Sequence, residues 1–360
     1  GSPVILVIDA RGMTRGIAPL ILGYQAFDRA VRIAGVILNN LGGARHEEKL
    51  RAVIEHYTDV AVVGAVPFDA RLAIVERHLG LVPSNEAVGA GATIDTVGAH
   101  VEAHVDLDRL LAIAHEAAPI PQSSTAERAS GTPRKPRPRI GIARDAAFGF
   151  YYADDLDALD AAGAKLVPIN MLAAPALPDI DALVIGGGFP EARMRELEAN
   201  EGLRHDLRRA IESGLPVYAE CGGLMYLARS IAWRGERARM VGAIPADVMM
   251  HDRPVGRGYT RLVATGVAAW LKIPAGTEIP AHEFHYSSLE NVAEGLGYAF
   301  HVARGHGADG ARDGIVYRNV LASYCHLRGA GEKGWARALV EQARDRMRLR
   351  GRGTLGASSG

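Results

Sequence analysis

The sequence has few cysteines and no long apolar run. Only Cys221 and Cys325 occur among 360 residues, too few for a disulfide framework in a chain of this size. No apolar stretch approaches the roughly 20 residues that a membrane-spanning helix needs, and the N-terminus lacks the basic flank and cleavage site of a signal peptide. We therefore expect a cytoplasmic protein without a membrane partner, in which each thiol has a packing or a chemical role.

An excess of charge of either sign is also missing. Lys and Arg total 41 residues and Asp and Glu total 41, so the formal net charge is zero. One basic cluster lies within 119–138, where Pro and Ser recur and aromatic residues do not occur. This composition favours a solvated linker over a nucleic-acid patch, and we expect no nucleic-acid partner.

Apolar runs alternate with helical patterns on both sides of this linker. They cover 4–8, 31–40 and 60–67 before it, and 139–145, 164–170, 181–191 and 215–223 after it. Such alternation predicts an α/β protein with mostly parallel sheets. We predict a first domain at 1–118, a linker at 119–138, a second domain at 139–345 whose later part, from 241 to 320, adds antiparallel strands, and a flexible tail at 346–360.

Cys221 stands where a predicted strand ends and a helical pattern begins. The stretch "PVYAECGGLMYLA" places it at a tight turn before two glycines, which permit a sharp reversal of the backbone. Backbone N–H groups at the start of the helix favour the nucleophilic thiolate. A lone cysteine is more often a buried apolar residue, but this context favours a catalytic nucleophile.

A nucleophilic thiol needs donors for an oxyanion and a base. "VIGGGFPE" at 184–191 ends another predicted strand, and the N–H groups near Gly187 and Gly188 are candidate donors. His326 in "VLASYCHLRG" is the candidate base, although a lone histidine at a strand end is usually structural. Strand alternation separates Cys325 from Tyr324 and His326, so we expect Cys325 to be a packing residue.

The stretch "HEFHY" at 282–286 contains two histidines three residues apart. Zinc peptidases use H-E-x-x-H, in which the two histidines lie four residues apart on one helix face. Because the Phe/Tyr-rich context here is typical of a strand, we exclude zinc catalysis.

Four motifs together resemble a known family. "GGGFPE", "AECGGLMYL", "HEFHYS" and "ASYCHLR" resemble, in this order, the cobyrinic acid a,c-diamide synthase family, whose second domain is a class I glutamine amidotransferase of the triad type. In the first half, "PVILVIDARGM", "RIAGVILNN" and "ERHLGLVPS" are similar to the second part of that family's dethiobiotin-synthetase-like ATP domain. The resemblance covers almost all of residues 1–345.

The resemblance implies a reaction and roles for individual residues. Cys221 would attack the side-chain amide of glutamine, with His326 as base and then acid, and N–H groups near Gly187, Gly188 and Gly222 would hold the oxyanion. The released ammonia would amidate the a and c acetate carboxylates of cobyrinic or hydrogenobyrinic acid, in cobalamin biosynthesis, after ATP and Mg²⁺ activate them.

Other residues receive less specific roles from the same resemblance. Asn39 and the segment 77–81 would contact ATP, although a strand-end turn explains Asn39 as well. Asp9 could serve the metal or the substrate, or cap a helix. His282, Glu283 and His285 would line the cleft near glutamine or the corrin, although they could equally be ordinary polar strand residues.

The sequence departs from the family pattern at two points. Many class I amidotransferases have Glu two residues after the histidine, but Arg328 occupies that position, so the residue that orients His326 stays undetermined. The motif G-x-x-x-x-G-K-[ST] does not occur, whereas the family carries this phosphate-binding loop upstream of the strand that Val4–Ile8 resembles. We therefore expect no ATP-dependent amidation by this chain alone.

Three alternatives stay open at this point. One is a related tetrapyrrole amidase, such as a nickel-sirohydrochlorin a,c-diamide synthase or a cobyric acid synthase. Another is a tetrapyrrole-binding or partner-binding module without turnover, and the last is a glutaminase subunit whose synthetase is a separate chain. The oligomeric state also stays open, with a homodimer as one option.

Overall fold

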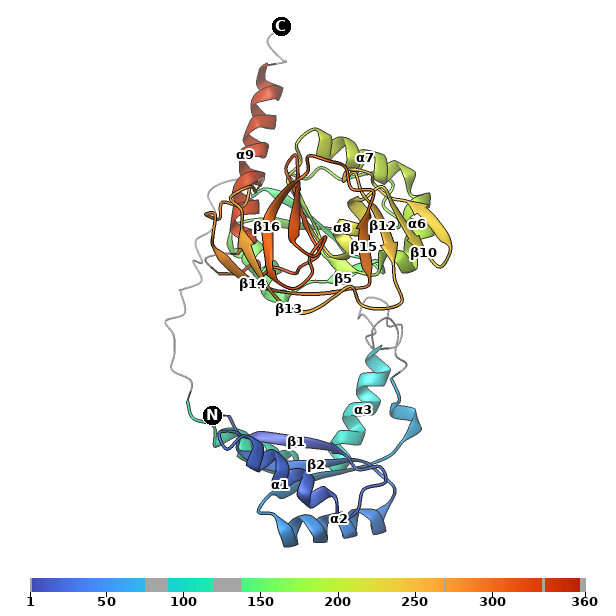
Figure 1. Cartoon of the computed structure of the whole chain (residues 1–360), viewed down its shortest axis with the longest axis vertical. Coiled ribbons are helices and arrows are strands. Elements are labelled where there is room, and N and C mark those ends of the chain that lie inside the picture. The colour runs from blue at the N-terminus through green and yellow to red at the C-terminus, as the bar shows by residue number, and fades with distance from the viewer. Residues whose placement is uncertain (1, 75–89, 120–136, 269, 332–333, 357–360) are drawn as a thin grey trace. The chain divides into compact units, whose positions relative to one another are not determined.

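The computed structural model describes residues 2–74, 90–119, 137–268, 270–331 and 334–356. These residues form two compact units, one within 2–119 and the other within 137–356 (Figure 1). Apart from its ends, the predicted linker at 119–138 lies outside the described residues, as does the candidate ATP segment 77–81.

The first unit is a three-stranded parallel sheet with helices. Strands β1 (Val4–Asp9), β2 (Ile33–Leu41) and β3 (Ala61–Pro67) lie in this order, and α1 (Ile17–Phe27) and α2 (Ala44–Tyr57) connect them. One face of β2 forms an apolar core with both helices, through Val36, Leu38, Ile17, Ile21, Leu50 and Ile54. Helices α3 (Ala90–His104) and α4 (Leu107–His115) follow. The strand–helix alternation predicted for this part is confirmed.

The second unit is built on a nine-stranded sheet. Its parallel half has the order β18 (Val320–Ser323), β9 (Val217–Glu220), β7 (Ala182–Ile185), β4 (Arg139–Ala143) and β6 (Lys165–Ile169). The antiparallel half has the order β14 (Glu278–His285), β13 (Gly256–Ala264), β16 (Gly297–Arg304) and β17 (Arg312–Tyr317). A smaller sheet contains β11 (Glu236–Arg239), β10 (Ser230–Trp233), β12 (Asp247–Met250) and β15 (Ser287–Glu290). The predicted α/β class, with antiparallel strands after residue 241, is confirmed.

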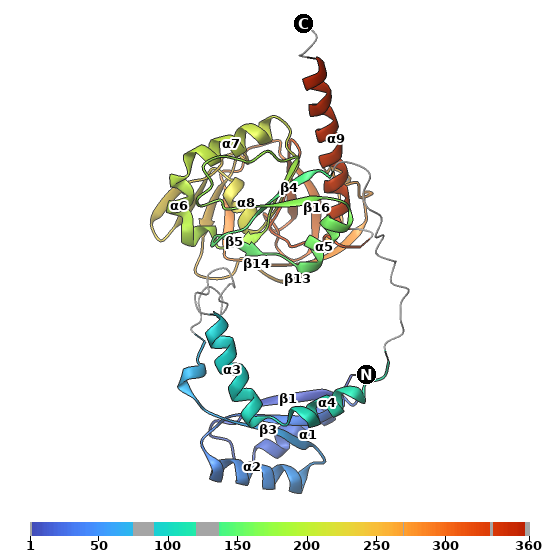
Figure 2. The same cartoon turned by 180° about the vertical axis from the view of Figure 1, so that it is seen from behind.

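Helices cover both faces of the parallel half (Figures 1 and 2). Leu183 and Ile185 of β7 pack in one core with α6 (Met194–Ala199), α7 (Glu201–Glu212) and α8 (Gly222–Leu227). Val184, between them in sequence, packs in the opposite core with α5 (Ala153–Ala161) and α9 (Trp335–Gly356). Strands β7 and β9 are buried on both faces, and apart from Glu220 at the end of β9 their residues are apolar or aromatic.

The C-terminal helix is longer than the sequence indicates. We expected a flexible tail from residue 346, but α9 continues to Gly356. Arg346 donates to the carbonyl of Ser213, and Arg350 donates to that of Ile180, so side chains from this segment bind the body of the unit. Neither α9 nor any other helix in the described part of the chain is long and apolar enough to cross a membrane.

Candidate active site

Cys221 lies at the turn between β9 and α8. Its backbone has φ 47° and ψ −102°, a strained conformation for a residue with a side chain. Glycine follows because the chain is crowded there: a Cβ at Gly222 would lie 2.9 Å from the carbonyl oxygen of Gly188. The Cys221 N–H donates to the carbonyl of Ser323 at 2.7 Å, which fixes the turn against the end of β18. The thiol is thus presented at the start of a helix by a rigid, strained elbow, and 9% of the residue is exposed.

His326 follows β18 and is brought to this elbow by strand pairing. Strand β18 runs parallel to β9, with Ser323 opposite Glu220. The backbone N–H of His326 also donates to the carbonyl of His282 at 2.8 Å, so β14 holds the same residue from its other side. The imidazole lies beside the Cys221 side chain, and its interaction with Cys221 is one of those that raise the pKa of His326. The structure therefore joins the two residues that the sequence proposed as nucleophile and base.

Glu220 is a functional candidate that the sequence analysis did not identify. Its Oε2 lies 3.3 Å from Nδ1 of His326, and its Oε1 accepts from the N–H of Leu327 at 2.8 Å and from the Tyr218 hydroxyl. The carboxylate is therefore placed to orient the imidazole. A signal was available in the motif itself, because this acid directly precedes Cys221.

Arg328 occupies the position where many amidotransferases have their glutamate. Its guanidinium forms an ion pair with Asp154 and lies over the ring of Tyr152, 4.7 Å from the ring centroid. It does not take the place of the missing acid, because Glu220 approaches His326 from β9 instead.

The surroundings of His326 favour its charged form. Burial alone would lower its pKa, but hydrogen bonds to Cys221 and to Glu220 outweigh burial and raise the pKa to about 10. The imidazole is therefore protonated at neutral pH, where it can stabilise a thiolate beside it. This pairing is the arrangement that a cysteine nucleophile needs for attack on an amide.

The glycine loop lies between the elbow and the imidazole. Strand β8 (Gly187–Gly188) pairs with β5 (Phe148–Phe150), and a Cβ at Gly187 would lie 2.9 Å from Cε1 of His326. Tyr151 holds the preceding residue, because its hydroxyl accepts from the N–H of Gly186 at 3.0 Å and donates to the carbonyl of Ala143. The structure therefore brings Gly187, Gly188 and Gly222 together beside Cys221 and His326.

The three residues expected to line a cleft, His282, Glu283 and His285, do not share one environment. His282 is half-buried, and its ring stacks on His326. Glu283 and His285 point to the other face of β14 and are 2% and 3% exposed. The cleft assignment is therefore corrected for these two residues, because alternation along a strand sends 282 and 283 to opposite faces.

Glu283 and His285 belong to a buried polar cluster. The carboxylate of Glu283 accepts from the backbone N–H groups of His306 and Gly307 at 2.6 and 2.7 Å. The Nδ1 of His285 lies 2.9 Å from the carbonyl of Ser287, and its ring stacks on Tyr324 at 4.1 Å between centroids. These contacts connect β14 with the strand that leads to His326, and so indicate a structural role.

Cys325 is also part of this interior. It is a free thiol with no exposed surface, and its Sγ lies 3.8 Å from the Glu283 carboxylate. Burial and the nearby Asp313 raise its pKa well above the usual range, which disfavours a thiolate. These surroundings differ from those of Cys221, which has a cationic partner.

The candidates in the first unit lie at the carboxyl ends of its strands. Asp9 and Asn39 stand opposite each other on β1 and β2, and the carbonyl of Asn39 accepts from the N–H of Ala10 at 2.8 Å. Asp9 accepts hydrogen bonds from Arg11, which hold its pKa below the usual range, and one from Asn40 at 3.3 Å. Asp9 is thus an ionised carboxylate at an exposed strand end.

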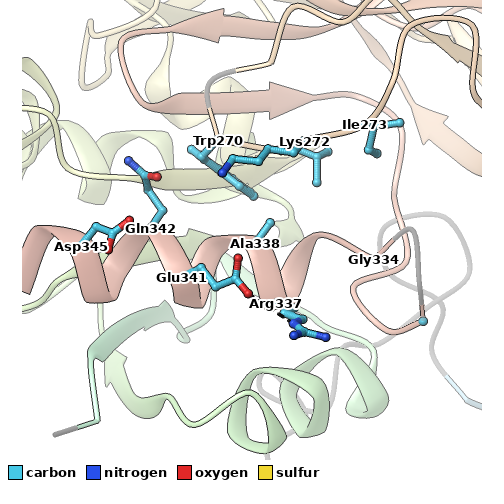
Figure 3. A pocket seen from close by; sticks show the side chains of 11 residues that line it. Trp270, Lys272, Ile273, Gly334, Arg337, Ala338, Glu341, Gln342 and Asp345 are labelled. Atoms are coloured by element: carbon cyan, nitrogen blue, oxygen red, sulfur yellow. Dashed lines mark hydrogen bonds and ion pairs between the residues drawn. The ribbon is translucent and has the colours of Figure 1, made fainter. Parts of the chain in front are cut away.

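A separate pocket of about 260 Å³ lies against α9 (Figure 3). Its walls combine apolar and charged side chains, including Trp270, Ile273, Lys272, Arg337, Glu341 and Asp345. None of its described lining residues belongs to the Cys221 site. The pocket therefore takes no part in the arrangement described above.

Known proteins are similar to this chain over almost its whole length. Residues 139–333 match the family described as CobB/CobQ-like glutamine amidotransferase domain. A cobyrinate a,c-diamide synthase from Magnetococcus marinus is 44% identical over 349 residues, which are 96% of this chain and 74% of the relative. The enzyme of the same name from Methanosarcina acetivorans is 42% identical over 367 residues, with 95% and 72% covered.

A solved structure, PurLQS from Thermotoga maritima, is 15% identical with a TM-score of 0.44, and the match covers 57% of this chain and 97% of that one. A likeness of this degree supports no inference about function. The relatives that match almost the whole chain and the match to the amidotransferase family do support one. They show that this chain belongs to the cobyrinate a,c-diamide synthase family of glutamine-dependent amidating ligases.

Proposed function

We propose that this chain releases ammonia from glutamine at Cys221, and that this ammonia amidates the a and c acetate carboxylates of cobyrinic acid once ATP has activated them, a step that this chain does not perform alone. The observation that carries the proposal is the contact of Cys221, His326 and Glu220 at the ends of β9 and β18. The acid is the one in the names of the relatives, and the family performs glutamine-dependent amidation in cobalamin biosynthesis.

In the first step, Sγ of Cys221 attacks the side-chain amide carbon of glutamine. The developing oxyanion would receive hydrogen bonds from backbone N–H groups near Gly187, Gly188 and Gly222. As the carbon–nitrogen bond breaks, His326 gives its proton to the leaving nitrogen, and ammonia departs. Cys221 is then a γ-glutamyl thioester, and His326 is neutral.

In the second step, His326 takes a proton from a water molecule as the oxygen attacks the thioester carbon. The carbon–sulfur bond breaks, glutamate leaves, and the thiolate–imidazolium pair is restored. The sum is glutamine and water to glutamate and ammonia. Glu220 accepts the Nδ1–H of His326 throughout, so that the other ring nitrogen faces the reaction.

Amide formation at the acceptor needs an activated carboxylate, and we propose ATP with Mg²⁺ as the activating agent. When bound, ATP would supply a phosphoryl group that turns the acceptor carboxylate into an acyl donor. Asp9, with Asn39 opposite it on β2, offers a carboxylate, but both of its oxygens accept hydrogen bonds from Arg11. The described residues contain no cluster of three or more metal-ligating side chains, and the sequence has no phosphate-binding loop, so they do not fit the nucleotide by themselves.

Glutamate release tests the proposal. We would compare the wild type, Cys221→Ala and the matched variant Cys325→Ala, each with and without cobyrinic acid, after a check of folding by circular dichroism. We expect release by the wild type and by Cys325→Ala, and none by Cys221→Ala. Equal release by the wild type and Cys221→Ala would contradict the assigned nucleophile. No release by the folded wild type under either condition would contradict the glutaminase role.

A further inference from the structure

A second histidine lies against the imidazole of the site. The rings of His282 and His326 are 4.8 Å apart between centroids and only 14° from parallel. Two backbone hydrogen bonds join the same residues, from His326 N–H to His282 at 2.8 Å and from His282 N–H to His326 at 3.4 Å. The stacking is therefore set by the register between β14 and the end of β18, and not by the side chains alone.

His282 also contacts Tyr152. The hydroxyl of Tyr152 lies 3.2 Å from its Nδ1, and the two rings meet edge to face at 6.1 Å between centroids. The guanidinium of Arg328 covers Tyr152 and pairs with Asp154. Consecutive contacts thus connect the exposed Arg328 to Tyr152, Tyr152 to His282, and His282 to His326.

The pKa values of the two stacked histidines are shifted in opposite directions. Burial and the nearby charge of His326 lower the pKa of His282 from its ordinary value, although Glu220 opposes this effect. His326 has a raised pKa, so near neutral pH the pair carries one positive charge, on His326. The hydroxyl of Tyr152, which contacts His282, is neutral and brings no negative charge that would favour a second proton on His282.

We propose that His282 is a positioning residue for His326 in the glutaminase reaction: its neutral ring covers one face of the imidazolium and fixes the plane in which His326 meets both Glu220 and Cys221. The side chain of His326 is only 14% exposed, so this cover is part of what keeps water from the cation. The inference rests on the proposed function, because it assigns a role within the same site.

Two substitutions of His282 distinguish the contribution of its flat ring from that of its ring nitrogen atoms. His282→Ala removes the cover, so that His326 can tilt away from Glu220 and Cys221. We expect kcat for glutamate release to fall about 10- to 100-fold, with KM for glutamine changed less than about threefold, since misorientation affects the reacting groups more than substrate binding. His282→Phe keeps a flat ring over His326, and we expect it to restore kcat to within about fivefold of the wild type.

A pH profile adds a signature that a merely structural residue would not give. Protonation of His282 at low pH places a second cation on the charged imidazole of His326. His282→Phe cannot take up this proton, and the acid limb of its kcat profile should therefore extend to lower pH than in the wild type. His205→Ala is the matched control, because His205 is exposed on α7, and its profile should equal that of the wild type.

The experiment measures kcat, KM and the rate of iodoacetamide labelling of Cys221 for the full chain and these variants. Slower labelling and lower kcat in His282→Ala, with recovery in His282→Phe, would support the proposal. Equal kcat in His282→Ala and wild type would overturn it, as would a His282→Phe variant that folds but is as impaired as His282→Ala. Absence of Cys221-dependent release in the wild type would instead overturn the proposed function, which keeps the two failures apart.

Discussion

The carboxylate of Glu220 offers the sharpest test of how His326 keeps its proton. Three donors converge on it: the Tyr218 hydroxyl and the Leu327 N–H on Oε1, and Nδ1–H of His326 on Oε2. Glu220→Gln replaces one oxygen by an NH₂ group, which is itself a donor. One of the three donors must then lose its acceptor, and the negative charge beside the imidazolium disappears.

The expected magnitude follows from the bond that is lost. A hydrogen bond to a charged group contributes about 1.5–3 kcal/mol, and a shift of one pKa unit corresponds to about 1.4 kcal/mol. Loss of Glu220 should therefore lower the pKa of His326 from about 10 by about one to two units. Because the acid form of His326 is the one that protonates the leaving amide nitrogen to give ammonia, the alkaline limb of activity should move to lower pH by the same amount. We expect kcat to fall about 10- to 100-fold in addition.

The assay is glutamate release by wild type and Glu220→Gln between pH 6 and pH 10, with urea unfolding as the check on stability. Tyr218→Phe is the matched control, since it removes one donor to Glu220 and leaves the charge and the bond to His326 in place. Its alkaline limb should stay where it is in the wild type. A Glu220→Gln variant with the wild-type pH profile and kcat within twofold would refute the role we assign to the carboxylate.

Two further predictions concern the glycine loop and the two thiols. A Cβ at Gly188 would overlap the carbonyl oxygen of Ala147, so Gly188→Ala should lower the free energy of unfolding in urea by about 1–3 kcal/mol and abolish glutamate release. Gly98→Ala is the control, because a Cβ at this position of α3 meets open space. It should raise the free energy of unfolding of the first unit by about 0.5–1 kcal/mol. In the folded chain, iodoacetamide should label Cys221 and leave the fully buried Cys325 unmodified, as mass spectrometry of the peptides would show. Equal labelling of both thiols, or an active Gly188→Ala, would contradict these expectations.

Local patterns were sufficient for some residues of the site and insufficient for others. Cys221 could be found because strand, turn and helix signals meet within a few residues. Glu220 stands next to it, yet its role could not be read in the same way, because the partner of a carboxylate depends on which strand lies alongside. That partner, His326, is 106 positions away in the chain.

The stretch that contains His282 and Glu283 shows the same limit. Alternation along a strand already separates these neighbours onto two faces. Which face meets the thiol site depends on the pairing of β14 with the end of β18, and a pattern of residue types does not contain that pairing.

Taken alone, the sequence settles the alternation of strands and helices, the glycine-flanked elbow at Cys221 and the order of its motifs, because each depends on residues close together in the chain. The tertiary structure decides that Glu220 lies against His326, that the ring of His282 stacks on it, and that the pKa of the imidazole is raised. Burial and contacts between distant strands set proton affinities, and these arise only when β9, β14 and β18 come together.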